Sequence, residues 1–165
     1  MLCMKHTLIL YYSFEGNSEW AATCLAEKLG EQADIGRLTV RREPPKRGFF
    51  KLLIGGRSAI KGIDPGLNEL TLNPADYQQI VLVFPIWAGT FAPAIGALLK
   101  KYPLEGKTVH LVASSASGSE GRAFDNIAAA LGGSTIASSV CLRLPGSNQA
   151  GAEEKLSQLA DALKA

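Results

Sequence analysis

Three short polar segments carry residue types that suit the binding of a phosphorylated, flat ligand. The first, segment 13–18, consists of Ser13, Phe14, Glu15, Gly16, Asn17 and Ser18. It precedes a helical pattern, so its backbone N–H groups lie at a helix N-terminus, where unsatisfied donors and partial positive charge attract anions. A plain turn with Asn17 or Ser18 as the helix cap fits the same residues. The segment lacks the GxxxxGK(S/T) pattern of a Walker motif.

The second segment, 85–91, combines an indole ring with small neighbours and follows a continuous apolar run. Its residues are Pro85, Ile86, Trp87, Ala88, Gly89, Thr90 and Phe91. A tryptophan in such a loop can stack on a flat aromatic ring, and Gly89 allows the backbone to approach a ligand closely. Packing of Trp87 against the edge of the core explains the pattern equally well.

The third segment, 114–121, is small and polar, with Ser114, Ser115, Ala116 and Gly118 among its residues. Its backbone N–H groups could wrap a ligand, and a surface turn would have the same composition. The sequence shows no Ser-His-Asp set, no paired catalytic carboxylates and no metal-ligand cluster, so we predict no catalytic side chain and no metal. His110 falls within a strand pattern, which favours a hydrogen-bonded core histidine.

The elements that position these segments alternate between strand and helix. Apolar runs predict five strands, at Thr7–Tyr12, Ile35–Val40, Ile80–Phe84, Thr108–Ala113 and Ile136–Leu142. Three- and four-residue spacing predicts helices at Trp20–Leu29, from Pro93 through Leu99, at Ala123–Leu131 (Phe124, Ile127, Ala128 and Leu131 inward) and at Glu153–Lys164. This alternation predicts an α/β fold, a doubly wound parallel sheet with helices on both faces. Ligands of such sheets bind beyond the carboxyl ends of the strands, where the three segments lie.

Length and composition fit a single domain over residues 1–165. The 165 residues are 47% hydrophobic and 19% charged, which is enough apolar material for a core. An irregular basic insert at about 43–73 interrupts the alternation, and within it we predict a short helix around Phe49–Ile60. From Arg41 to Lys61 the sequence contains seven basic residues and one acidic residue, Glu43.

Charge and cysteine usage exclude several classes of protein. A net charge of +2 is too small to argue for a nucleic-acid partner. The three cysteines are far apart, which argues against a zinc site and a disulfide framework. No apolar run reaches the roughly 18–20 residues of a membrane span, and the first residues lack a signal-peptide layout. We therefore expect a cytoplasmic protein with reduced thiols.

Two of the segments resemble the flavin loops of the flavodoxin family. YYSFEGNS, residues 11–18, is similar to the phosphate-loop pattern (S/T)-x-T-G-N-T, and PIWAGTFAPAI, residues 85–95, to the second flavin loop of short flavodoxin-like proteins. The insert at 49–61, of the type GFFKLLIGGRSAIKG, resembles a segment of the same branch. The likeness covers essentially the whole chain. It implies a flavodoxin-like sheet of five parallel strands in the order 2-1-3-4-5.

The resemblance also implies an FMN site built from the three segments. The phosphate loop would comprise Ser13, Phe14, Glu15, Gly16, Asn17 and Ser18. Trp87 would stack on the isoalloxazine, flanked by Pro85 and Ile86, while Ala88, Gly89 and Thr90 approach the ring edge. Ser114, Ser115, Ala116 and Gly118 would border the pyrimidine and ribityl portions. Three departures stand out: Glu15 and Ser18 replace threonines, and the third segment lacks an aromatic residue.

The function implied is that of an FMN-binding redox flavoprotein in which the flavin carries electrons or hydride. One class is an NAD(P)H-dependent reductase with a quinone or free flavin as acceptor. The alternative is an electron carrier of the flavodoxin type between partner proteins, and a third is a domain that has lost its flavin, which Glu15 favours. The near-neutral to basic charge and the single stacking aromatic favour the enzyme over the carrier. Homodimer formation is left open.

Overall fold

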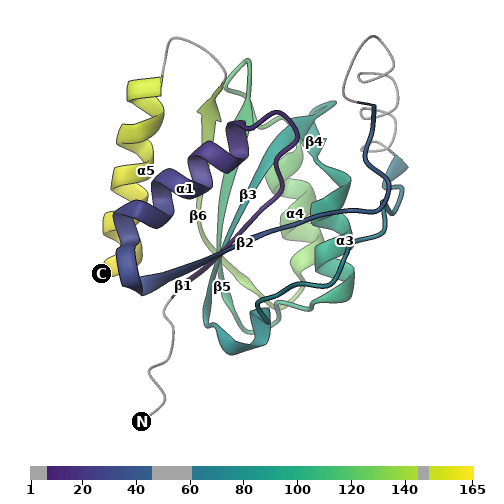
Figure 1. Cartoon of the computed structure of the whole chain (residues 1–165), viewed down its shortest axis with the longest axis horizontal. Helices are drawn as coiled ribbons and strands as arrows, with labels where there is room; N and C mark the ends of the chain where they lie inside the picture. The colour runs from purple at the N-terminus through teal and green to yellow at the C-terminus, as the bar shows by residue number, and fades with distance from the viewer. Residues whose placement is uncertain (1–6, 46–60, 145–148) are drawn as a thin grey trace.

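Five parallel strands form the centre of the computed structural model, which describes residues 7–45, 61–144 and 149–165 (Figure 1). The strands β1 (Thr7–Tyr11), β2 (Ala33–Arg37), β3 (Gln79–Trp87), β5 (Thr108–Ser115) and β6 (Thr135–Arg143) lie in the order β2-β1-β3-β5-β6. This confirms the predicted order, with the short strand β4 (Thr90–Phe91) added beside β3. The chain winds away from β1 in both directions, so the carboxyl ends of β1 and β3 border the crevice where such sheets bind ligands.

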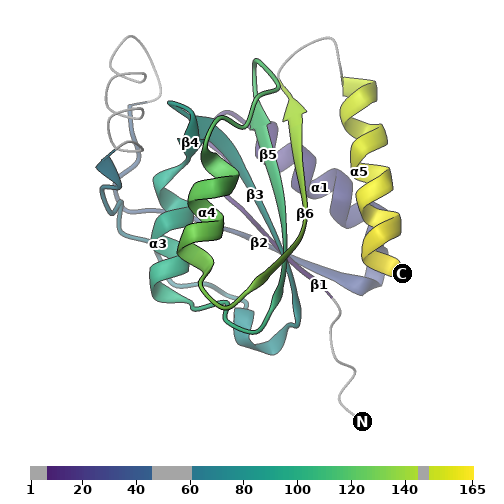
Figure 2. The same cartoon turned by 180° about the vertical axis from the view of Figure 1, so that it is seen from behind.

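Helices cover both faces of the sheet, as Figures 1 and 2 show. Helices α1 (Asn17–Leu29) and α5 (Gln149–Lys164) cover one face, and α3 (Pro93–Lys101) and α4 (Ala123–Leu131) the other. Alternate residues of β1 enter the two cores: Leu8 and Leu10 pack towards α3 and α4, and Ile9 towards α1 and α5. Two short 3-10 turns, Gly30–Gln32 and Pro74–Asp76, complete the described elements. None of the described helices has the length and apolarity needed to cross a membrane.

Strand β2 departs most from the prediction. It occupies Ala33–Arg37 rather than Ile35–Val40, because it is an edge strand with half-exposed side chains and no apolar run to mark it. The buried residues Leu38 and Val40 follow the strand, and Val40 forms an isolated antiparallel bridge with Leu67.

Two helices begin earlier than predicted. Helix α1 begins at Asn17 rather than Trp20, and α5 at Gln149 rather than Glu153, because the apolar stripe is absent from both first turns. Helix α4 has the predicted bounds, but Ala128 is exposed rather than inward. The helix predicted around Phe49–Ile60 lies outside the described residues.

His110 is the hydrogen-bonded core histidine that the strand pattern predicted. Its side chain is buried in β5, with Nδ1 2.7 Å from Ser138 Oγ and Nε2 3.3 Å from Gln79 Oε1. Burial lowers the pKa of His110, because the charged imidazolium is poorly solvated there.

We therefore expect His110 to make folding stability depend on pH. In the unfolded chain the His110 imidazole binds a proton near pH 6.5, whereas in the folded chain it binds that proton only at lower pH. The stabilising contribution is present above about pH 6.5 and is lost as the pH falls through the folded pKa. Urea unfolding between pH 8 and pH 5 should show this loss in the native chain and a smaller loss in His110→Gln, in which all other titrating groups are retained. Equal losses would contradict the assignment.

Candidate functional site

The loop after β1 presents the N-terminus of α1 at the carboxyl edge of the sheet. Gly16 takes the N-cap position with φ of 97°, and no side chain caps the helix. Ser13 Oγ instead accepts a hydrogen bond of 3.1 Å from the Gly16 N–H. The alternative with Asn17 or Ser18 as cap is therefore wrong. Because the first N–H groups of a helix have no partner within it, this end is suited to hold an anion.

Ser18 and Glu15 have different positions in this loop. Ser18 is buried, and its Oγ lies 3.1 Å from Ser114 Oγ at the end of β5. This contact ties the first segment to the third. Glu15 is exposed, so water surrounds much of its carboxylate.

Trp87 ends β3 instead of lying in a loop. Pro85 still pairs with Ser114 of β5, and Ile86 and Trp87 then pair antiparallel with β4, in the registers Ile86–Phe91 and Trp87–Thr90. The half-buried indole makes edge contacts with Tyr12 and Phe14, at ring-centroid distances of 5.8 Å and 5.6 Å. Two aromatic neighbours therefore fix its orientation.

The turn between β3 and β4 has a left-handed backbone. Ala88 has φ of 49° and Gly89 φ of 74°, as a two-residue hairpin turn of type I′ requires. Ala88 is the one non-glycine residue with positive φ in the described part of the chain. The turn is docked on the start of α4, where Gly89 O accepts 2.7 Å from the Arg122 N–H and Thr90 Oγ1 accepts 2.9 Å from Asn126 Nδ2.

The third segment is held by its own hydroxyl groups and by β6. Ser115 Oγ donates to Ser119 O at 2.9 Å, and Arg143 Nε donates to Ala116 O at 3.3 Å. A Cβ on Gly118 would lie 3.3 Å from Arg143 Cβ, which shows how closely the segment packs on β6. Ser114 is thus the residue of this segment that the structure joins to the first segment.

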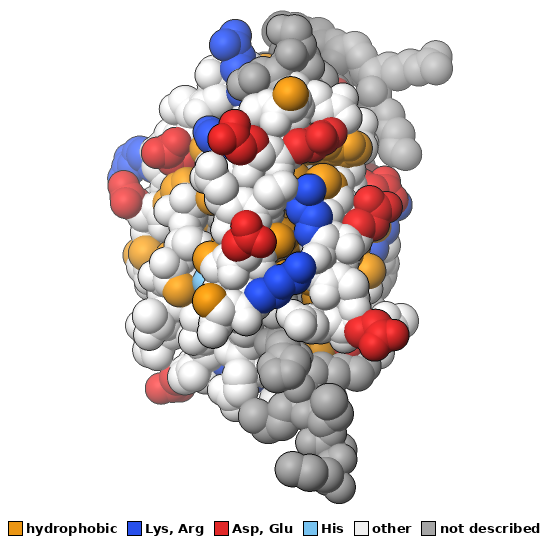
Figure 3. Space-filling model, turned by 90° about the vertical axis from the view of Figure 1, so that its left-hand side faces the viewer, with side chains coloured by type: hydrophobic (Ala, Val, Ile, Leu, Met, Phe, Trp, Pro, Cys, Tyr) orange, Lys and Arg blue, Asp and Glu red, His pale blue; other side chains and the backbone are white. Residues whose placement is uncertain are grey.

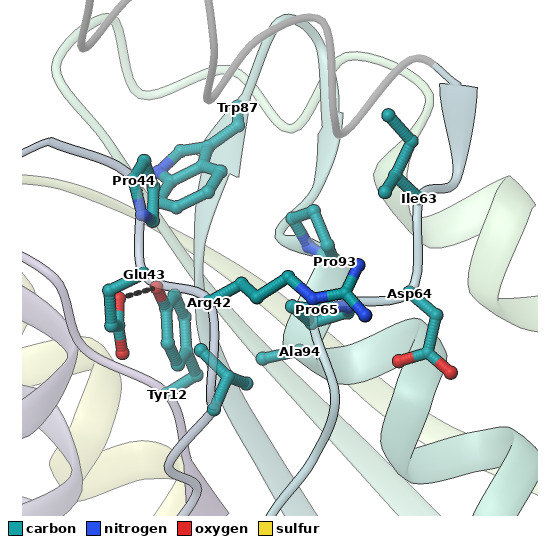
Figure 4. Close-up of a pocket in the computed structure, with 11 residues that line it drawn as sticks. Tyr12, Arg42, Glu43, Pro44, Ile63, Asp64, Pro65, Trp87, Pro93 and Ala94 are labelled. Carbon is teal, nitrogen blue, oxygen red and sulfur yellow. Dashed lines mark hydrogen bonds between the residues drawn. The ribbon is translucent and has the colours of Figure 1, made fainter.

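Two cavities meet at Trp87. A small one of about 30 Å³ is lined by Ser13, Phe14, Glu15, Asn17, Ser18, Pro85 and Trp87, all of them sequence-predicted site residues. A larger one of about 200 Å³ lies beside it and is shown in Figure 4. Its lining comprises Tyr12, Val40, Arg42, Glu43, Pro44, Ile63, Asp64, Pro65, Trp87, Pro93 and Ala94. The structure therefore joins the first two segments at one cavity, whereas none of the predicted residues from 88–90 or 114–118 lines either of the two.

The sequence analysis missed most of the larger cavity. Tyr12 is buried and its hydroxyl donates 2.7 Å to Glu43 Oε2. Burial, followed by the Glu43 carboxylate, raises the pKa of the Tyr12 hydroxyl well above its usual value. Backbone N–H groups of Arg41 and Arg42 donate to Gly66 O and Pro65 O, which brings two distant stretches together. No local sequence pattern signals such a pairing across the insert.

The fold is similar to that of solved flavoproteins. A candidate flavoprotein of Bacteroides eggerthii DSM 20697 aligns with a TM-score of 0.76 at 17% identity, over 97% of this chain and 98% of that one. A flavoprotein of Lactobacillus acidophilus NCFM, solved in complex with FMN, aligns with 0.68 at 21% identity over 82% and 91%. A flavodoxin of Fusobacterium nucleatum, solved bound to FMN, aligns with 0.58 at 12% identity over 98% of both chains. No protein-family model and no curated protein sequence matches the chain.

At these identities the likeness establishes the fold. The chain has a flavodoxin-like α/β fold, as the resemblance implied.

The close approach of Gly89 to Gly121 should make Gly121 sensitive to substitution. A Cβ on Gly121 would lie 2.5 Å from Gly89 O, and its φ of 57° disfavours other residues. Gly132 has nearly the same φ, 60°, and nothing within 4 Å of its Cβ position. Both alanine variants should therefore lose roughly 1–3 kcal/mol for the backbone conformation. Gly121→Ala should lose a further 1–3 kcal/mol or so because of the clash.

Urea unfolding of the two variants measures this difference directly. Equal losses for Gly121→Ala and Gly132→Ala would show that the hairpin turn does not press on the third segment.

Proposed function

We propose that this chain binds FMN at the carboxyl ends of β1 and β3 and acts as a redox flavoprotein. One observation carries the proposal: the uncapped N-terminus of α1 and the half-buried Trp87 border the same cavity. An anion site and an aromatic plane are thereby combined, and FMN has both a phosphate and a flat ring. The neighbours solved with FMN support the choice of ligand.

In this proposal the first segment holds the phosphate, through the Ser13 side chain and the free N–H groups at the start of α1. Glu15 is exposed, so water screens the repulsion between its carboxylate and the phosphate. Ser18 acts indirectly, because its hydroxyl is engaged with Ser114. Bound FMN supplies the electron or hydride chemistry.

Trp87 packs on the flavin ring, with the turn Ala88–Thr90 near the ring edge and Ser114–Gly118 bordering the rest of the ligand. The edge contacts of Trp87 with Tyr12 and Phe14 orient the indole before the ligand arrives. Such preorganisation lowers the entropic cost of binding.

The proposed reaction is NAD(P)H-dependent reduction of a quinone or of free flavin. Arg41 and Arg42 near this edge favour the approach of an anionic dinucleotide. Charge elsewhere is mixed: Figure 3 shows acidic and basic side chains interspersed over the side of the molecule that carries α1 and α5. The alternative is a carrier that passes electrons between partner proteins. An experiment described below distinguishes this alternative from the reductase proposal.

Adding a negative charge at the start of α1 should weaken FMN but not riboflavin. Asn17→Asp places a carboxylate on the first residue of α1. It repels a bound phosphate and should weaken FMN by roughly tenfold, or about 1.4 kcal/mol. The same carboxylate suits the helix dipole, so thermal stability should not fall. Flavin fluorescence titrations measure both affinities.

Gln78→Glu is the matched control, because it adds the same charge at an exposed position before β3, at the opposite edge of the sheet. Its FMN affinity should stay within about twofold of the native value. Equal affinities of the native chain for FMN and riboflavin would contradict the proposed phosphate site.

Anaerobic mixing with NADH or NADPH separates enzyme from carrier. We expect the visible absorption of oxidised flavin in the FMN-loaded protein to bleach slowly with one of the two dinucleotides. Added salt should slow the reaction, because screening weakens the attraction of the dinucleotide. If neither dinucleotide bleaches the flavin while a separate reductase protein does, the enzyme proposal fails and the carrier alternative stands.

A further inference from the structure

The larger cavity beside Trp87 has the composition of a ligand site. Most of its walls are apolar, formed by Val40, Pro44, Ile63, Pro65, Pro93, Ala94 and Trp87. Ile63 is 46% exposed and is one of two large hydrophobic residues exposed in the described chain. A hollow with mostly apolar walls and a few polar groups has the composition typical of small-molecule sites.

This cavity is separate from the proposed FMN site. Of the residues assigned to FMN, Trp87 alone lines it, and the turn 88–90 and segment 114–118 do not. The other walls come from Tyr12, from residues 40–44 and 63–65, and from the start of α3. A ligand in this cavity and FMN at the α1 N-terminus would therefore contact different residues, apart from Trp87, which borders both sites.

The polar groups of the cavity differ in how they are engaged. Glu43 accepts a hydrogen bond from Tyr12, and Asp64 Oδ1 accepts 2.8 Å from the Gly66 N–H. The guanidinium of Arg42, in contrast, has no hydrogen bond or ion pair with any residue of 7–45, 61–144 or 149–165. Figure 4 shows its side chain reaching across the cavity from the Glu43 side towards Pro93 and Asp64.

We propose that this cavity binds a flat aromatic molecule of one or two rings that carries a carboxylate. The proline and indole walls suit a planar ring. Arg42 presents a forked set of donors that matches a carboxylate in two parallel hydrogen bonds. The volume of about 200 Å³ is below the range of drug-sized pockets, which limits the ligand to a small ring system. The site does not require bound flavin.

Isothermal titration calorimetry of the full chain with 2-naphthoate tests the proposal. One molecule should bind per chain, and Arg42→Gln should weaken binding by about tenfold. Arg41→Gln is the matched control: it removes the same charge one residue away, where the stem of Arg41 packs along Gly66 outside the cavity. Its affinity should stay within about twofold. The neutral probe 2-naphthalenemethanol should bind Arg42→Gln and the native chain within about twofold of each other.

Four results would overturn the proposal. These are no binding of 2-naphthoate at millimolar concentration, equal losses in the two arginine variants, a neutral probe as sensitive to Arg42→Gln as the carboxylate, and displacement of 2-naphthoate by FMN. The last result would make the cavity part of the flavin site. Because FMN affinity is measured in its own titration, failure of this proposal and failure of FMN binding are read separately.

Discussion

The candidate site depends on how β3 leaves the sheet. β3 pairs with β5 as far as Pro85, and its last two residues, Ile86 and Trp87, then pair antiparallel with β4. The turn has a left-handed backbone at Ala88 and Gly89, and it is held by the hydrogen bond from Arg122 and by contact with Gly121. Because both strands of the hairpin are fixed, Trp87 is held in one position beyond the carboxyl end of β1. Its ring there contacts Tyr12 and Phe14. Strained backbone of this kind persists when the surrounding structure compensates for it.

The sequence predicted the elements that carry a strong apolar signal. β1, β5 and α4 bury regular runs or stripes, and the alternation of strands with helices allowed few topologies. β2 was misplaced because an edge strand has no continuous apolar run, and its neighbours Leu38 and Val40 are buried for a different reason: they pack beneath the chain that returns at Leu67. The hairpin was missed because Ala88-Gly89 is a weak turn signal, since alanine disfavours positive φ.

The first segment could be predicted as an anion site because its signal is local: small polar residues precede a helix. The larger cavity depends on contacts that no local pattern contains. Tyr12 and Glu43 are far apart in sequence, and so are Arg41 and Arg42 from their backbone partners Gly66 and Pro65. A basic stretch in a sequence indicates solvated charge, an anionic partner or both, and only the folded chain shows that Arg42, and not the adjacent Arg41, lines the larger cavity.

Trp87 gives the two cavities a physical connection. Phe14 lines the small cavity and Tyr12 the larger one, and each makes an edge contact with the same indole. A ligand that shifts the indole on one side must therefore alter its packing on the other. By thermodynamic linkage, any change that FMN makes in the affinity of the larger cavity is matched by an equal change that the second ligand makes in the affinity for FMN. Since the indole is held between two rings and by a paired strand, its freedom to shift is small, and the two sites are expected to bind nearly independently.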